Sequence, residues 1–234
     1  MQWGFPESVS TFGDRIDATY GAIFVAVAIM FVIVEVALVF FVIRYRHKEG
    51  RRADPVHGNT RIEIVWTVVP FLGVMFIAIT SINVWLDLKH PDRIPADALE
   101  LAVAAKQFEW NVTYPGVDGQ LGTGDDFVRR NQLHLPVGRP VRVLLTAEDV
   151  IHSFFLPHFR VKQDAVPGME IPVWFEATTP GEYVLGCAEL CGLGHYRMQG
   201  SVTVHSAAEF DAWQRGIEPA TAARSAEPSN VASR

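Results

Sequence analysis

Cys187-Ala-Glu-Leu-Cys191-Gly-Leu-Gly-His195-Tyr-Arg-Met198 brings two thiols, an imidazole and a thioether into one short segment. Its two cysteines are the only ones among the 234 residues. Thiolate and thioether sulfur favour Cu(I), imidazole suits copper, and a weak axial methionine is typical of copper sites that transfer electrons. A site of this kind with one copper ion uses one thiolate. The second cysteine therefore predicts two copper ions bridged by both sulfurs.

Two other uses of the cysteine pair are open. Taken alone, the spacing favours a disulfide, which an exported domain permits. Zinc is the second alternative, but structural zinc sites are usually closed by Cys and His, and Met198 is a poor zinc ligand. The positions of His195 and Met198 after the cysteines favour copper over both.

A second imidazole is needed for the second copper ion, and His152 is the candidate. It closes the run Glu148-Asp-Val-Ile-His152, which follows the strand-like run Val141-Arg-Val-Leu-Leu145. A β-sandwich can assemble a metal site from a residue at a strand end and a later loop. No chemistry is assigned to the other histidines, which are His47, His57, His90, His134, His158 and His205.

Two long apolar segments predict a helical hairpin across a membrane, within residues 20–90. The first, about residues 20–43, contains Glu35 as its only charge, and the second, about residues 64–86, contains none. Each exceeds the ~20 residues that a helix needs to cross a bilayer core. The loop 44–61 is rich in Arg and Lys, and short basic loops stay on the cytoplasmic side. We therefore expect a multi-pass protein of the bacterial inner membrane, with both termini on the outer, periplasmic side.

The segments that flank the hairpin differ in character. Residues 1–19 are polar and acidic, which predicts an exported N-terminal segment rather than a cleavable signal peptide. From residue 91 to 215, short β-branched and aromatic runs alternate with Pro and Gly turns, which predicts one antiparallel β-sandwich or barrel. The expected strands include residues 99–103, 107–114, 141–145, 171–175, 182–185 and 201–204. Residues 216–234 are rich in Ala, Ser and Pro, which predicts a disordered tail.

The cysteine segment, the run Asp149-Val-Ile-His152 and the run Asp164-Ala-Val-Pro-Gly168 together identify a resemblance. From the first apolar segment to about residue 206, the chain resembles subunit II of the haem-copper oxidases of the cytochrome c oxidase type. That subunit carries the binuclear copper centre CuA on a cupredoxin-like sandwich. The resemblance implies that the copper ligands are His152, Cys187, Cys191, His195, Met198 and the backbone carbonyl of Glu189. It also implies that the Glu189 side chain reaches a magnesium ion shared with subunit I.

Further roles follow only from this resemblance. Glu63 matches a glutamate at the entrance of a proton path into subunit I, although an acid at a helix start also simply favours the helix dipole. Phe108 replaces a tryptophan that accepts electrons in common members. Phe108 or Trp110 takes that role, or both fill the core. Three acids, Glu148, Asp149 and Asp164, either dock cytochrome c or solubilise the surface.

The resulting hypothesis is a membrane-anchored subunit of a proton-translocating oxidoreductase. The copper pair accepts electrons from an external carrier such as cytochrome c and passes them to haem in a partner subunit, where oxygen is reduced. The net charge of -6 falls after residue 91, since residues 1–91 hold eight basic and eight acidic side chains. Such a domain attracts a basic protein rather than nucleic acid. The alternatives are the CuA subunit of a nitric oxide or nitrous oxide reductase, and a membrane-tethered copper carrier.

Some features are left open by the sequence. The electron donor, the haem types, the other subunits and proton pumping are not determined by any motif. The role of Glu35 in the first span is also open. The Gly- and Asp-rich run 115–126 is expected to be a polar turn, with calcium binding as the alternative.

Overall fold

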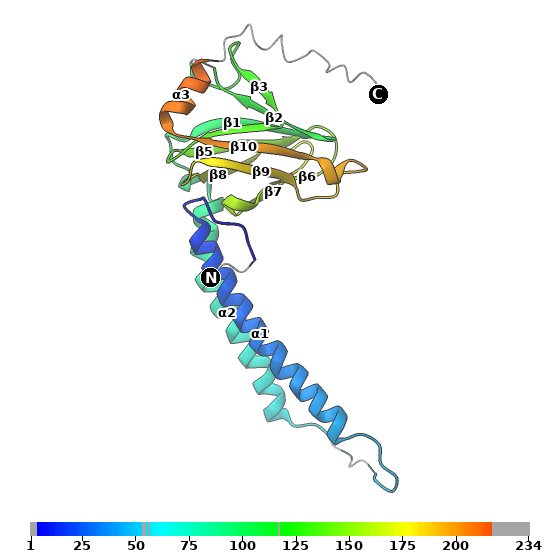
Figure 1. Ribbon diagram of the computed structural model, residues 1–234. Helices are drawn as coiled ribbons and strands as arrows, with labels where there is room; N and C mark the ends of the chain where they lie inside the picture. The colour runs from blue at the N-terminus through cyan, green and yellow to red at the C-terminus, as the bar shows by residue number, and fades with distance from the viewer. Residues whose placement is uncertain (1–3, 53–54, 56, 117, 217–234) are drawn as a thin grey trace. The chain divides into compact units, whose positions relative to one another are not determined.

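A computed structural model describes residues 4–52, 55, 57–116 and 118–216 (Figure 1). The chain forms two compact units. One comprises residues 15–87, and the other joins the N-terminal residues up to Asp14 with the chain from Leu88 onward.

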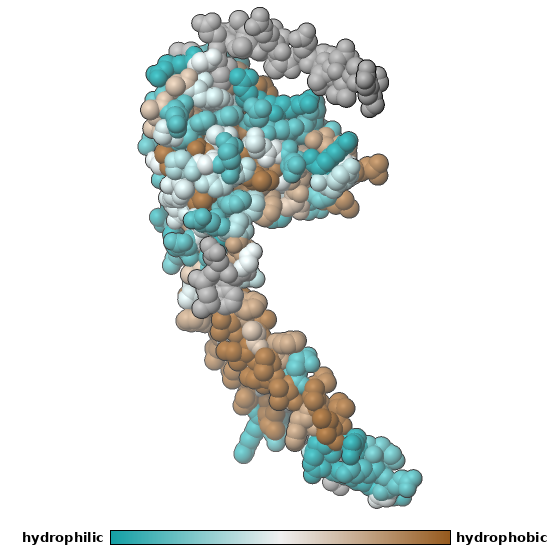
Figure 2. Space-filling model, viewed as in Figure 1, coloured by the Kyte–Doolittle hydropathy of each residue, from teal (hydrophilic) through white to brown (hydrophobic). Residues whose placement is uncertain are grey.

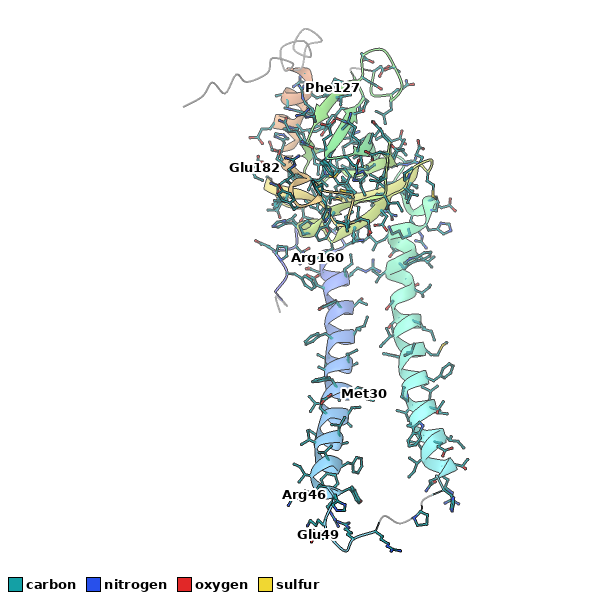
Figure 3. The ribbon with its side chains drawn as sticks, turned by 90° about the vertical axis from the view of Figure 1, so that its right-hand side faces the viewer. Met30, Arg46, Glu49, Phe127, Arg160 and Glu182 are labelled. Atoms are coloured by element: carbon teal, nitrogen blue, oxygen red, sulfur yellow. The ribbon has the colours of Figure 1, made fainter. Side chains whose placement is uncertain are left out.

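The first unit is a hairpin of two long helices, α1 (Gly13–Arg44) and α2 (Thr60–Lys89), which run antiparallel (Figure 3). The Asn59 side chain caps α2, since its Oδ1 accepts from the Arg61 N–H at 3.1 Å. Arg15 Nη1 pairs with Asp87 Oδ2 at 2.8 Å, where α1 starts and α2 ends. Both predicted spans lie inside these helices.

Apolar side chains cover the surface of both helices (Figure 2). Each helix is long and apolar enough to cross a membrane. The most apolar stretch of each helix contains no residue that is buried within the structure. A continuous exposed apolar surface of this extent requires lipid or neighbouring membrane subunits around it. The hairpin therefore fits a membrane anchor.

The second unit is a sandwich of two five-stranded sheets. The first sheet has the order β3 (Phe127–Arg130), β2 (Glu109–Tyr114), β1 (Leu99–Lys106), β5 (Pro140–Ala147) and β8 (Ile171–Glu176). The second has the order β4 (Gln132–Pro136), β10 (Gln199–His205), β9 (Gly181–Cys187), β6 (His152–Leu156) and β7 (Val161–Ala165). Short helical elements complete the unit: η1 (Pro91–Arg93), η2 (Pro157–Phe159), η3 (His195–Arg197) and α3 (Ala207–Arg215).

The core lies between the two sheets. In β1 and β5, buried and half-buried residues alternate strictly, because every second side chain of a strand faces the core. Trp110, Tyr114, Phe154 and Phe175 are among the largest fully buried side chains. Each buried side chain of this size contributes about 1.5–3 kcal/mol relative to an exposed one. The predicted fold class, a two-helix hairpin followed by a cupredoxin-like sandwich, is confirmed.

The strand pairing differs from the purely antiparallel expectation. β1 pairs with β5 in parallel, and β10 pairs with β4 in parallel. Alternating residues mark a strand and its buried face, but they do not identify its neighbour or its direction. The structure also contains β3, β4, β6 and β7, which lie outside the strands named from the sequence, and the short helix α3, which was not anticipated.

The N-terminal segment is part of the sandwich unit. Val9 is buried, its N–H donates to the His158 carbonyl at 2.9 Å, and its carbonyl accepts from the Thr178 N–H at 2.9 Å. The Ser10 hydroxyl donates to the Phe159 carbonyl at 2.7 Å. Part of the predicted exported segment is therefore an N-terminal ribbon, a backbone segment at Val9 and Ser10 that is hydrogen-bonded to the β-domain. The helix α1 already begins at Gly13, within the predicted segment. At the other end, Gly216 caps α3, and residues 217–234 of the predicted tail lie outside the described residues.

Candidate metal centre

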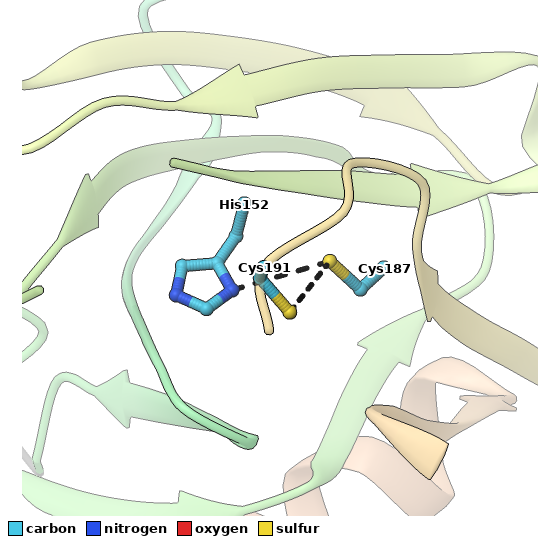
Figure 4. A group of neighbouring side chains, drawn as sticks. All are labelled: His152, Cys187 and Cys191. Carbon is cyan, nitrogen blue, oxygen red and sulfur yellow. Dashed lines mark hydrogen bonds between the residues drawn. The ribbon is translucent and has the colours of Figure 1, made fainter. Parts of the chain in front are cut away.

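The two cysteines lie close together at one end of the sandwich. Cys187 is the last residue of β9, and Cys191 lies in the loop that follows. Their sulfurs are 3.8 Å apart, and both cysteines are free (Figure 4). A disulfide would bring the sulfurs to about 2.05 Å. The pair is therefore arranged as two separate donors.

Each sulfur has its own imidazole. His152 Nδ1 lies 4.0 Å from Cys187 Sγ, and His195 Nδ1 lies 3.7 Å from Cys191 Sγ. His152 is the first residue of β6 and is fully buried, whereas His195 opens the η3 turn. The two predicted histidines thus approach the sulfur pair from a strand and from a loop.

Two further donors complete the group. The Met198 sulfur lies 3.7 Å from Cys191 Sγ, and Met198 is buried. On the other side, the Glu189 carbonyl oxygen lies 3.2 Å from Cys187 Sγ. The structure therefore brings together all six predicted donors, including the backbone oxygen.

The distances between these donors fit a shared metal. Metal–sulfur bonds of about 2.3 Å and metal–nitrogen bonds of about 2.0–2.1 Å allow two donors on one ion to be up to roughly 4.3–4.6 Å apart. The sulfur–sulfur and sulfur–nitrogen distances, 3.7–4.0 Å, lie within this limit. Thiolate, thioether and imidazole are the donors that soft copper ions prefer. The residues present therefore fit a copper centre.

The electrostatics of the sulfur pair also favour a cation. Burial, followed by the neighbouring Cys187 thiol, raises the pKa of the Cys191 thiol to about 11. At this pKa the Cys191 thiol is protonated at neutral pH unless a positive charge lies close to it. A bound metal ion supplies that charge and deprotonates coordinating thiols.

Asp149 orients the buried imidazole. Its Oδ1 lies 2.9 Å from His152 Nε2, which directs Nδ1 toward the sulfurs. The same carboxylate accepts from the Gln107 N–H at 2.8 Å and the Val150 N–H at 2.7 Å. Desolvation alone would raise the pKa of Asp149, but these hydrogen bonds hold it below its ordinary value. Such an acid–imidazole pair fixes the tautomer of a metal-binding histidine.

The two candidate aromatics occupy different environments. Trp110 is fully buried, and its ring makes an edge contact with the His152 ring at a centroid distance of 6.2 Å. Phe108 is half-buried, and a Cβ added to Gly194 would lie 2.5 Å from its ring. Trp110 therefore belongs to the core, and Phe108 is the aromatic of the two that an external protein can approach.

The three candidate docking acids also differ. Asp149 is engaged with His152, and Asp164 Oδ1 accepts from the Ser153 hydroxyl at 2.7 Å and from Lys162 at 3.2 Å. The hydrogen bond from Ser153 is the main reason that the pKa of Asp164 is lowered. Glu148 is exposed. Asp149 and Asp164 therefore hold neighbouring side chains, whereas Glu148 is a surface acid.

The loop that carries the cysteines also presents apolar side chains to solvent, which the sequence reasoning missed. Leu190, Leu193 and Tyr196 are 79%, 96% and 84% exposed. In the sequence, this exposed apolar surface was indicated by the large apolar residues that lie between the ligands of the loop. An exposed apolar group of this kind is typical of a protein contact surface.

The remaining predicted features lie elsewhere. Glu63 lies in the first turn of α2 and Glu35 lies within α1. In the Gly- and Asp-rich run, Asp118 accepts from the Gln120 N–H at 2.9 Å and Asp126 accepts from the Gly122 N–H at 2.7 Å. These carboxylates accept hydrogen bonds from the turn itself.

Comparison with known proteins identifies the family. Residues 106–205 match the family described as "Cytochrome C oxidase subunit II, periplasmic domain", and residues 1–84 match "Cytochrome C oxidase subunit II, transmembrane domain". The alternative cytochrome c oxidase subunit 2 of Bradyrhizobium diazoefficiens is 34% identical over 233 residues, covering 90% of this chain and 82% of that protein. Cytochrome c oxidase subunit 2 of Thermostichus vulcanus is 31% identical, covering 90% of this chain and 77% of that protein.

Among solved structures, the periplasmic domain of subunit II of cytochrome oxidase from Bradyrhizobium japonicum is 33% identical and covers 53% of this chain and 95% of that one, with a TM-score of 0.46. The family matches cover both the apolar helices and the domain with the paired cysteines. Copper binding and electron transport follow from membership of this family. With its two apolar helices and its β-sandwich, this chain belongs to the cytochrome c oxidase subunit II family, the members of which form part of haem-copper oxidase complexes.

Proposed function

We propose that the donors at the end of the sandwich hold a binuclear copper centre, CuA. Cys187 and Cys191 would hold both ions through their thiolates, and His152, His195, Met198 and the Glu189 carbonyl would supply the remaining ligands. The observation that carries this proposal is the arrangement of the two sulfurs, which lie 3.8 Å apart with a separate imidazole beside each. When bound, the copper pair accepts and releases one electron at a time.

The surrounding residues suit electron transfer. His152 and Cys187 lie in neighbouring strands, since β6 pairs with β9, and the loop returns to the sheet through the hydrogen bond from the Cys187 N–H to the Met198 carbonyl at 3.1 Å. Donors held by a sheet move little when the charge of the site changes. Burial of His152, Cys191 and Met198 also excludes water from one side of the centre.

The electron donor is proposed to be a basic one-electron carrier such as cytochrome c. The exposed side chains of Leu190, Leu193 and Tyr196 offer an apolar contact surface beside the ligands, and Phe108 packs against the same loop. The acidic charge of the exported part steers a basic partner toward this domain, and salt weakens such steering.

The electrons are proposed to leave toward haem in subunit I, where oxygen is reduced. Glu189 is exposed while its carbonyl faces Cys187, so its carboxylate is available for a magnesium ion shared with that subunit. We further propose that the basic loop after α1 faces the cytoplasm, and that the copper domain faces the periplasm. In that orientation Glu63 lies at the cytoplasmic end of α2, as an entrance for protons requires.

Electron paramagnetic resonance of the full chain tests the central proposal. The chain is purified in detergent, loaded with copper and oxidised, and its metal content is measured. We use the full chain because Val9 and Ser10 form part of the β-domain. Two coppers per chain with a seven-line hyperfine pattern support a shared centre, and Cys187→Ser is expected to abolish that pattern. A four-line spectrum from one copper in the wild type, or an unchanged spectrum in Cys187→Ser, would contradict the bridging assignment.

A further inference from the structure

The turn between β1 and β2 contacts both ligand-bearing segments. The Gln107 side-chain amide donates to the Cys191 carbonyl at 2.6 Å. The Gln107 backbone N–H donates to Asp149 Oδ2 at 2.8 Å, and the other oxygen of Asp149 pairs with His152 Nε2 at 2.9 Å. One residue outside the predicted ligand set thus connects a thiol ligand to a histidine ligand.

The next residue presses on the same loop. The Phe108 ring lies so close to Gly194 that a Cβ there would be 2.5 Å from the ring. At Gly192, whose φ is +128°, a Cβ would lie 2.7 Å from Gln107 Nε2. Gly194 is therefore required by the close approach of the Phe108 ring, and Gly192 by its positive φ, which residues with side chains rarely adopt.

Other parts of the cysteine loop are held by the sheet. The Ala188 N–H donates to the Ser153 carbonyl at 3.1 Å, and the Met198 carbonyl accepts from the Cys187 N–H of β9 at 3.1 Å. Cys191 lies between these two points, and Gln107 supplies a hydrogen bond to its backbone. The spacing between Cys191 and the rest of the donors therefore depends on the position of the Gln107 amide.

We infer that Gln107 is a positioning residue of the metal centre, which fixes Cys191 relative to His152 through its side chain and through Asp149. This inference rests on the proposed copper function of the same donors. Loss of the amide N–H leaves the partly buried Cys191 carbonyl without this donor, and the loop is then free to shift its sulfur. Copper retention and the electronic signature of the centre should both change, although Gln107 touches no metal.

Two variants isolate the hydrogen bond. Gln107→Met preserves the approximate shape of the side chain without a donor, and Gln107→Glu replaces the donor with an acceptor. Gln132→Met is the matched control, because Gln132 is an exposed glutamine on β4 of the same domain. Gly194→Ala is a second, independent variant that displaces the Phe108 ring from the loop.

The full chain in detergent is loaded with copper, and the rate of copper loss to an excess of chelator is measured together with the paramagnetic spectrum. We expect both Gln107 variants and Gly194→Ala to lose copper about tenfold faster, at the lower end of the range for groups that support a metal ligand. Their hyperfine pattern should differ from that of the wild type, while Gln132→Met should match the wild type. Thermal unfolding of the copper-free chains should differ little, which separates positioning from a general loss of stability.

Two results would overturn the inference. If the Gln107 variants and Gly194→Ala keep wild-type copper retention and spectrum, Gln107 does not position the centre, and the proposed function is unaffected. If the wild type itself binds no copper pair, both the proposed function and this inference fail.

Discussion

Replacement of Asp149 by asparagine is the most informative single change at the site. The carboxylate accepts three hydrogen bonds, from His152 Nε2, the Val150 N–H and the Gln107 N–H. An asparagine side chain has one acceptor oxygen, so its NH2 group must face either Gln107 or the pair formed by Val150 and His152. If it faces His152, the imidazole accepts at Nε2 and carries its proton on Nδ1, the atom that faces the sulfurs.

The structure allows the size of the effect to be estimated. Loss of a carboxylate that orients a metal-binding histidine typically lowers metal affinity by about 10–100-fold, which is about 1.4–2.8 kcal/mol. The loss of folding free energy is smaller, because the Asp149 side chain is 33% exposed and solvent screens its interactions. We expect about 1 kcal/mol of destabilisation in the absence of copper.

The stability effect should depend on pH. Because the hydrogen bonds hold the pKa of Asp149 below its ordinary value, the ionised carboxylate stabilises the fold above about pH 4. This contribution is lost as the pH falls through the folded-state pKa. The difference in unfolding free energy between the wild type and Asp149→Asn should therefore disappear in acid.

Competition with a chelator measures the copper affinity, and thermal unfolding measures the stability. Glu148→Gln is the matched control, since it removes one negative charge from the adjacent exposed residue. We expect Glu148→Gln to retain copper as the wild type does. Equal copper affinities for Asp149→Asn and Glu148→Gln would refute the reasoning, because the effect would then be one of charge alone.

Three further predictions concern other positions. Met198→Leu should keep the copper pair but shift its reduction potential, because the axial ligand tunes the potential of such a site; an unchanged potential in a redox titration would exclude Met198 as a ligand. Phe108→Trp should speed oxidation of reduced cytochrome c by the assembled oxidase if electrons enter at Phe108, and an unchanged rate would favour another route. Val9→Asp should lower the unfolding free energy by about 3 kcal/mol, because it buries a carboxylate in the sandwich. Val128→Asp, at an exposed position, is the control. Equal unfolding free energies for the two variants would show that the N-terminal ribbon adds no stability.

Residue type and spacing were sufficient for several conclusions. A span such as residues 64–86 contains no charge, and the cost of unsatisfied backbone groups in lipid leaves a helix as its structure. The donors between Cys187 and Met198 were also predictable, because soft ligands so close in sequence share one site in most folds. The β-branched runs 99–103 and 141–145 predicted strands that the structure contains as β1 and β5, since branched side chains fit the pleated surface of a sheet.

Other conclusions required positions in space. The acids Asp149 and Asp164 look alike in the sequence, yet one holds a histidine and the other is bound by Ser153 and Lys162. Phe108 and Trp110 are both aromatic, but only the structure shows that Trp110 is buried in the core and that Phe108 is half-buried. Gln107 carries no motif, so its contact with Cys191 could not be inferred from its identity.

The sequence by itself thus determined the membrane hairpin, the β-rich domain and the chemistry of the donors, because these depend on composition, periodicity and residue type. Only the tertiary structure decided the parallel pairing of β1 with β5, the packing of Val9 into the sandwich and the hydrogen bonds that support the ligands. These features join residues that are distant in sequence. Their formation depends on the complementarity of complete surfaces, which no local pattern encodes.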